Sequence, residues 1–148
     1  MIQRIQTVFL LIATGAFITQ FFTPILKSSQ MAVMGIFQDG QAFTSENQIA
    51  IVFLGITMVA CIIAIFLFKN RGLQKQIVII SIITLLLGNL FGAYAFIAPA
   101  DEIMRKSQAQ IFPGLGAFMP IIAFAALILA YRGINKDDKI VKSMDRLR

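Results

Sequence analysis

The chain has 148 residues, of which 58% are hydrophobic and only 14% are charged, and its mean hydropathy is +0.83. An ordinary soluble domain is about half apolar and about a quarter charged, so this composition excludes that class and indicates a membrane protein. The net charge of +6 would suggest nucleic-acid binding in a soluble protein. Here the charges flank long apolar runs instead, so we expect no nucleic-acid partner.

Four long intervals contain no Lys, Arg, Asp or Glu: residues 5–26, 47–68, 76–100 and 107–131. Each is longer than the roughly 18 to 20 residues that a helix needs to cross about 30 Å of hydrocarbon. In lipid the backbone must satisfy its own hydrogen bonds, so these intervals predict helices even where β-branched residues dominate. We therefore predict an all-α integral membrane protein, with a four-helix transmembrane bundle in residues 1–132. The predicted helices lie at about 5–26, 47–68, 76–98 and 113–131.

Local signals mark the ends of the first two predicted helices. The first reaches the vicinity of Pro24, where a helix break is tolerated. Ser45 and Gln48 fit a capping box at the start of the second, in which Ser45 accepts a hydrogen bond from a free amide and Gln48 reaches back. The short basic turn at residues 69–72 makes the second and third helices antiparallel neighbours.

Polar residues are rare within the predicted spans. In the third helix, Gly88 and Gly92 lie four residues apart, which lets another helix approach closely, and Asn89 can hydrogen-bond across that contact. Small residues four apart also occur on other helices, which favours packing within the bundle over a partner-binding face. The outer half of the first helix contains Gln20 and three threonines. Lining a wet cavity is one interpretation of these residues, and bonding to nearby carbonyls or helices is the simpler one.

The second outer loop and the fourth helix contain further local signals. Asp101 and Glu102 precede Arg105 and Lys106 by three or four residues, which predicts a short surface helix with exposed ion pairs. Pro120 lies inside the fourth predicted helix, where we expect a kink.

Residues 133–148 form a separate basic cytoplasmic tail in this interpretation, and we predict that it contains a short amphipathic C-terminal helix. If the tail is helical, Ile140, Met144 and Leu147 share one stripe. The tail could contact either anionic lipid headgroups or a protein partner. The acidic residues favour a protein partner slightly, because they add nothing to the binding of anionic lipid. The residues assigned to this contact are Lys136, Asp137, Asp138, Lys139, Ile140, Lys142, Met144, Asp145, Arg146, Leu147 and Arg148.

The distribution of basic residues predicts an orientation. If both termini are cytoplasmic, the inner segments hold ten Lys and Arg residues, and the outer segments hold only Lys27, Arg105 and Lys106. Such a bias follows the positive-inside rule, so we predict a multi-pass protein with both termini in the cytoplasm.

The predicted spans contain little that could carry chemistry. They contain no ionisable Asp, Glu, Lys or Arg, the chain has no histidine, and Cys61 is its single cysteine. Proton-coupled transport, intramembrane catalysis and redox chemistry need such groups. We therefore expect no enzyme activity, no catalytic residue, no metal site and no cofactor.

Four segments together resemble a known family: the opening MIQRIQT, the turn FKNRGLQ, the segment PGLGAFMP and the ending KDDKIVKSMDRLR. They are similar to small four-pass inner-membrane proteins of Bacteroidota, the domain of unknown function 4293. The resemblance covers essentially the whole chain, although Phe9 and Met144 depart from the residues typical of the family. It implies a Gram-negative inner membrane and a tail whose exact sequence matters more than its charge, and it brings no catalytic residues.

Three functions remain open. The favoured one is a non-enzymatic accessory or assembly subunit of a larger inner-membrane complex, in protein translocation or envelope biogenesis, because the chain is small, has short loops and ends in a structured tail. The second is a lipid-binding or small-molecule-binding protein or carrier with a cavity near Asn89 and Pro120, which a tightly packed interior would contradict. A surface enzyme that uses Asp101, Glu102 or the tail acids is the least favoured. Expected partners are membrane lipids and a membrane or cytoplasmic protein, and a homo-oligomer is compatible with the sequence.

Overall fold

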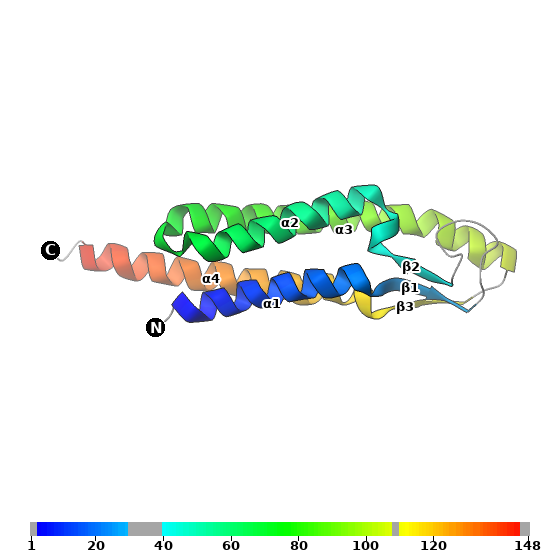
Figure 1. Cartoon of the computed structure of the whole chain (residues 1–148), viewed down its shortest axis with the longest axis horizontal. Coiled ribbons are helices and arrows are strands. Elements are labelled where there is room, and N and C mark those ends of the chain that lie inside the picture. The colour runs from blue at the N-terminus through cyan, green and yellow to red at the C-terminus, as the bar shows by residue number, and fades with distance from the viewer. Residues whose placement is uncertain (1–2, 30–39, 108–109, 146–148) are drawn as a thin grey trace.

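The computed structural model describes residues 3–29, 40–107 and 110–145, which form an elongated four-helix bundle (Figure 1). The helices are α1 (Gln3–Phe22), α2 (Gln48–Phe66), α3 (Arg71–Ser107) and α4 (Met119–Asp145). Each contains a stretch that is long and apolar enough to cross a membrane. Large apolar side chains remain exposed along all four helices, as expected where lipid is the solvent. The predicted all-α membrane bundle is therefore confirmed.

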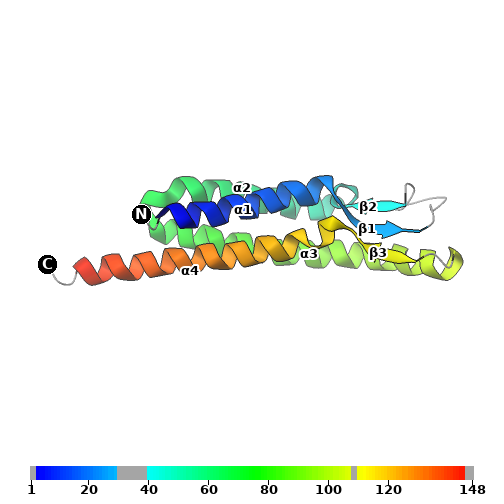
Figure 2. The same ribbon diagram turned by 90° about the horizontal axis from the view of Figure 1, so that it is seen from below.

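The bundle consists of two helix pairs. α1 packs most extensively on α4, and α2 packs most extensively on α3 (Figures 1 and 2). The second pair is joined by a turn of 3-10 helix, η2 (Leu67–Lys69), after which the side chain of Asn70 accepts a hydrogen bond from the amide of Leu73 at 3.2 Å. The predicted antiparallel contact between these two helices is confirmed. All four helices contribute to the core, which includes Leu10 of α1, Cys61 of α2, Val78 of α3 and Leu127 of α4.

Glycine allows the close contact between α2 and α3. A Cβ atom added at Gly88 would lie 2.6 Å from the Cβ of Phe53, and one added at Gly92 would lie 3.6 Å from the Cβ of Ala50. The first distance is shorter than real Cβ contacts allow, so α2 can lie this close only against a glycine. Gly88 and Gly92 thus contact a neighbouring helix inside the bundle.

A small sheet covers one end of the bundle, opposite the end where α1 begins and α4 finishes (Figure 2). It consists of β1 (Pro24–Ser28), β2 (Gln41–Phe43) and β3 (Ile111–Pro113) in the antiparallel order β2-β1-β3. The sequence analysis missed all three strands and assigned the beginning of β1 to the first helix. Because proline has no N–H to donate to the preceding turn, the chain leaves the helix before Pro24 and continues as a strand.

The segment after β3 crosses directly over the start of β1. The amide of Gly114 donates to the carbonyl of Ile25 at 2.7 Å. A Cβ atom at Gly114 would lie 2.1 Å from the carbonyl oxygen of Pro24, and one at Gly116 would lie 2.7 Å from that of Thr23. The glycines of the PGLG segment are therefore required by a backbone-to-backbone approach.

α3 is longer than predicted. It continues through Pro99 to Ser107, so the separate surface helix expected at residues 101–106 is wrong: these residues are the last turns of α3. Tertiary contacts explain the extension, because Phe96 is buried with Ala42 of β2, and Ala100 packs against the same cluster. Packing on the sheet stabilises turns that the proline by itself would disfavour.

The cap of α2 and the start of α4 also differ from the prediction. Residues 44–46 form a 3-10 turn, η1 (Thr44–Glu46), and the side chain of Asn47 caps α2 by accepting from the amides of Ile49 and Ala50, so the capping box of Ser45 and Gln48 is wrong. α4 begins at Met119 after another 3-10 turn, η3 (Leu115–Ala117). Pro120 therefore lies in the first turn of α4, where its missing N–H has no partner to lose, instead of kinking the middle of the helix.

α4 runs without a break from Met119 to Asp145, so the first part of the predicted tail continues the fourth helix. Its end extends past the ends of the other three helices (Figures 1 and 2).

Candidate functional site

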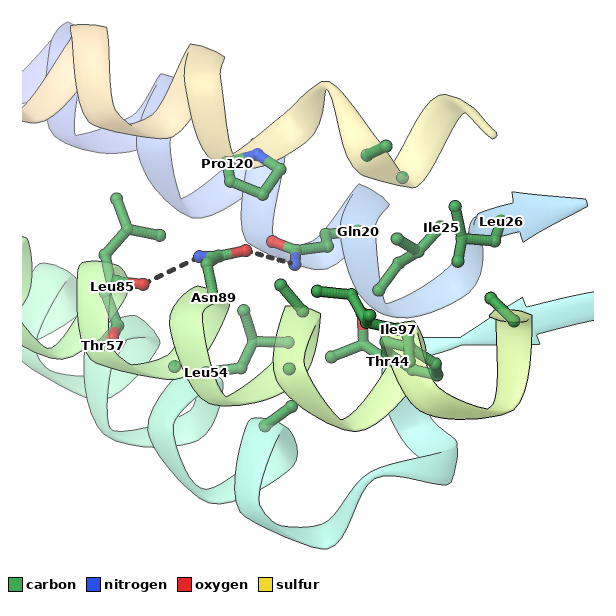
Figure 3. Close-up of a pocket in the computed structure, with 18 of the residues that line it drawn as sticks. Gln20, Ile25, Leu26, Thr44, Leu54, Thr57, Leu85, Asn89, Ile97 and Pro120 are labelled. Carbon is green, nitrogen blue, oxygen red and sulfur yellow. Dashed lines mark hydrogen bonds between the residues drawn. The ribbon is translucent and has the colours of Figure 1, made fainter. Parts of the chain in front are cut away.

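A cavity of about 580 Å³ lies at the sheet end of the bundle (Figure 3). All four helices, strands β1 and β3 and the turns η1 and η3 contribute to its lining. Ligand pockets in proteins typically measure about 300 to 1,000 Å³. Apolar side chains dominate the lining, among them Ile25, Leu26, Leu54, Leu85, Phe96 and Ile97.

The cavity exists because small residues gather where the helix pairs meet the sheet. Protein interiors are normally packed closely, with few voids larger than a water molecule. Here seven lining residues have no side-chain atom beyond Cβ: Ala50, Gly88, Gly92, Ala93, Ala100, Gly116 and Ala117. Since Gly88 and Gly116 are also required by close approaches of other elements, the packing that builds this end of the bundle also leaves the space open.

Two amide side chains meet across the cavity (Figure 3). The amide nitrogen of Asn89 donates to the carbonyl of Leu85 at 2.8 Å, which turns its oxygen toward α1. That oxygen accepts from Nε2 of Gln20 at 3.4 Å. Gln20 is only 3% exposed, and its Oε1 is buried without a hydrogen-bond partner among the described residues. Because Gln20 uses its side-chain nitrogen to donate to Asn89, the atom that remains for another partner is its oxygen, which can only accept.

A second unpaired polar atom belongs to Thr44 of η1. This residue lines the cavity and is 3% exposed, and in the described part of the chain its buried Oγ1 has no hydrogen-bond partner. The other two threonines of the lining are satisfied, since Thr57 donates to the hydroxyl of Thr84 at 2.8 Å and Thr84 donates to the carbonyl of Ile80 at 2.9 Å. Leaving a buried polar group unpaired costs about 1 to 3 kcal/mol, so both atoms need an explanation.

The interior of the cavity carries no cation among the residues that the structure describes. Of the lining residues, only Asp101 is charged, and its side chain is exposed. The cavity is thus an apolar space with neutral hydrogen-bonding groups and one carboxylate that water can reach.

The residues singled out in the third helix all lie at this cavity. Gly88, Asn89 and Gly92 line it, and so does Pro120. The sequence analysis missed Thr44 and did not pair Gln20 with Asn89. The sequence signal for Gln20 was its position among the polar residues of the first helix. The three threonines of that group donate to backbone carbonyls of the preceding turn, which agrees with the simpler interpretation.

A second polar cluster lies at the opposite end of the bundle. Asp137 of α4 is 6% exposed, and its carboxylate accepts a hydrogen bond from the side-chain amide of Gln6. The guanidinium of Arg71 donates to the backbone carbonyl of Asp137 at 3.0 Å. These contacts tie α4 to both α1 and α3.

This cluster changes the role expected for the predicted tail. Asp137 was assigned to a lipid or partner contact, but its side chain is buried, like that of Ile134 one turn earlier, on a helix that packs against α1. Lys136, Lys139 and Ile140 are exposed. The side chains of Lys142, Met144 and Asp145 and all of Arg146, Leu147 and Arg148 lie outside the described residues, and so does most of the predicted apolar stripe.

The remaining groups with chemical potential are few. Cys61 is a free thiol that is fully buried. Within the described part of the chain, no group of three or more His, Cys, Asp or Glu residues is placed to hold a metal ion.

Comparison with known proteins places the chain in a family. No curated protein and no solved structure matches it. The family model of the domain of unknown function DUF4293 matches residues 2–147, which is nearly the entire chain. The protein therefore belongs to the DUF4293 family.

Proposed function

We propose that this protein binds a lipid or a small apolar molecule in the cavity at the sheet end of its bundle. The supporting observation is an apolar space of about 580 Å³ whose lining includes two buried polar atoms that no described residue pairs. An empty space of this size loses dispersion contacts, and the unpaired atoms lose hydrogen bonds. A ligand that fills the space and satisfies the atoms offsets both costs.

We further propose that the protein works in a bacterial inner membrane with both termini in the cytoplasm. The start of α1 and the end of α4 lie at the same end of the bundle (Figure 1), in keeping with an even number of spans. The positive-inside bias of the Lys and Arg residues supports this orientation.

Two matched substitutions test ligand binding. Ala117 lines the cavity, whereas Ala125 of α4 is exposed on the surface of the helix. We expect the ring of Ala117→Phe to occupy part of the cavity and to lower the amount of co-purified ligand severalfold, whereas Ala125→Phe leaves it unchanged. The measurement is mass spectrometry of organic extracts from protein that was purified in a mild detergent. An equal ligand content in wild type and both variants would contradict the proposal.

A second candidate function is that of an accessory or assembly subunit in a larger membrane complex, for protein translocation or envelope biogenesis. The end of α4 projects past the other helices (Figure 2), and this favours the second candidate. Lys136 and Lys139 are exposed in the last turns of α4. Purification of a natively expressed, tagged copy tests it. Stoichiometric recovery of other membrane or cytoplasmic proteins would support it, and recovery of a lone chain or a homo-oligomer would count against it.

A further inference from the structure

We infer that the ligand of this cavity is a neutral lipid whose head carries a hydrogen-bond donor, such as a hydroxyl group. The inference rests on the proposed function and specifies the class of molecule that the cavity accepts. It follows from which atoms the lining leaves unpaired and from the absence of a cation among the described lining residues.

The amide pair sets the first requirement. Asn89 donates to the carbonyl of Leu85 and accepts from Nε2 of Gln20, so the orientation of both amides is determined by that carbonyl. The atom of Gln20 that remains free is Oε1, which can only accept. A ligand group that pairs with it must therefore be a donor.

The hydroxyl of Thr44 is compatible with the same ligand class. A threonine hydroxyl has one donor and two acceptor sites, so it can pair with a hydroxyl of the ligand in either direction. An ester or ketone oxygen satisfies Thr44 but leaves Oε1 of Gln20 unpaired. A hydroxyl group is the simplest head that can satisfy either atom.

Charge sets the second requirement. A buried carboxylate or phosphate is strongly disfavoured without a counter-ion. The described lining offers no Lys or Arg, and its one charged residue, Asp101, would repel an anion. A cationic amine would gain little from Asp101, because the side chain of this acid is exposed and an ion pair with it is weakened by water. Leu54, Leu85, Phe96 and Ile97 instead provide an apolar surface for a hydrocarbon chain.

The test compares lipids that have the same hydrocarbon chain and differ only in the head group. The full-length protein is placed in nanodiscs of dioleoylphosphatidylcholine, whose head has no hydrogen-bond donor, and is photolabelled with a diazirine analogue of oleyl alcohol. Unlabelled oleyl alcohol, methyl oleate and oleate then compete for labelling at alkaline pH, where oleate is ionised. We expect oleyl alcohol to compete about tenfold more strongly than either of the others, as the loss of one hydrogen bond to a buried acceptor implies.

Two variants in α1 test whether the preference for oleyl alcohol depends on Oε1 of Gln20. Gln20→Leu removes Oε1 and keeps the bulk of the side chain, so we expect it to abolish the preference for oleyl alcohol over methyl oleate. The control is Thr14→Val, because the hydroxyl of Thr14 bonds to the carbonyl of Leu10 and Thr14 does not line the cavity. Thr14→Val should keep the wild-type preference.

The outcomes separate this inference from the proposed function. Saturable labelling of cavity residues with equal competition by all three lipids would overturn the donor requirement and leave ligand binding intact. Stronger competition by oleate would overturn the neutral class. Labelling that does not saturate, or that maps to the outer helix faces, would overturn both the inference and the proposed function.

Discussion

At the scale of single residues, Gly88 connects the packing of the bundle to its cavity. It lies directly against Phe53 of α2 and also lines the cavity. Two other residues, Gln20 and Asp137, are buried polar side chains at opposite ends of the bundle, and each has one oxygen that pairs with no described residue. Only the oxygen of Gln20 belongs to a residue of the cavity lining, which is why the two are assigned different roles.

A pair of glycine substitutions tests the contact of α2 with α3. In Gly88→Ala, the added methyl group would lie 2.6 Å from the Cβ of Phe53, so the helices must move apart. We expect the free energy of unfolding to fall by about 1 to 3 kcal/mol relative to Gly55→Ala, whose added methyl group meets no atom within 4 Å. Denaturant titration in detergent micelles measures the difference. Equal stability of the two variants would show that Gly88 is not a close-packing position.

At the scale of the elements, the sheet determines where the first and third helices end. β1 replaces the last residues of the helix predicted at 5–26, and the contact with the sheet extends α3 to Ser107. The pairing of β1 with β3 joins residues far apart in sequence, as in the hydrogen bond from the amide of Ser29 to the carbonyl of Gln110. Short strands of this kind give no local sequence signal within an apolar run.

A substitution in the connection after β3 tests the role of the sheet. In Gly114→Ala, the added methyl group would lie 2.1 Å from the carbonyl oxygen of Pro24, so β1 and β3 must separate or shift. We expect trypsin to cleave after Lys27 of β1 severalfold faster than in wild type, because paired strands resist proteolysis. Mass spectrometry of the fragments identifies the site.

Gly72→Ala is the control for that experiment, because its added methyl group meets nothing closer than Oδ1 of Asn70 at 3.6 Å. It should leave cleavage after Lys27 unchanged. Equal cleavage rates in Gly114→Ala and wild type would mean that the strands tolerate the added methyl group.

At the scale of the whole molecule, the two ends of the bundle differ in chemistry. One end carries the sheet, the cavity and the exposed Lys27, and the other carries the Gln6–Asp137–Arg71 cluster and the exposed Lys136 and Lys139. The cluster lies where α1, α3 and α4 meet, so it holds together the end at which α4 projects from the bundle.

Cysteine labelling tests which end faces the cytoplasm. We expect Lys27→Cys to react with a membrane-impermeant maleimide once the outer membrane is permeabilised. Ser143→Cys, exposed near the end of α4, should react only after the inner membrane is opened as well. The native Cys61 is fully buried and provides the unreactive background. The opposite pattern would reverse the proposed orientation.

The sequence by itself determined the membrane class and the four helices, because crossing hydrocarbon requires a long run without charge, and such a run is visible locally. It also drew attention to Gly88, Asn89, Gly92 and Pro120. Only the tertiary structure decided how these residues come together. The sheet, the extension of α3, the burial of Asp137 and the pairing of Gln20 with Asn89 depend on contacts between distant segments, which no local pattern specifies. The cavity is the result of those contacts, since its volume is the space that the packed elements leave between them.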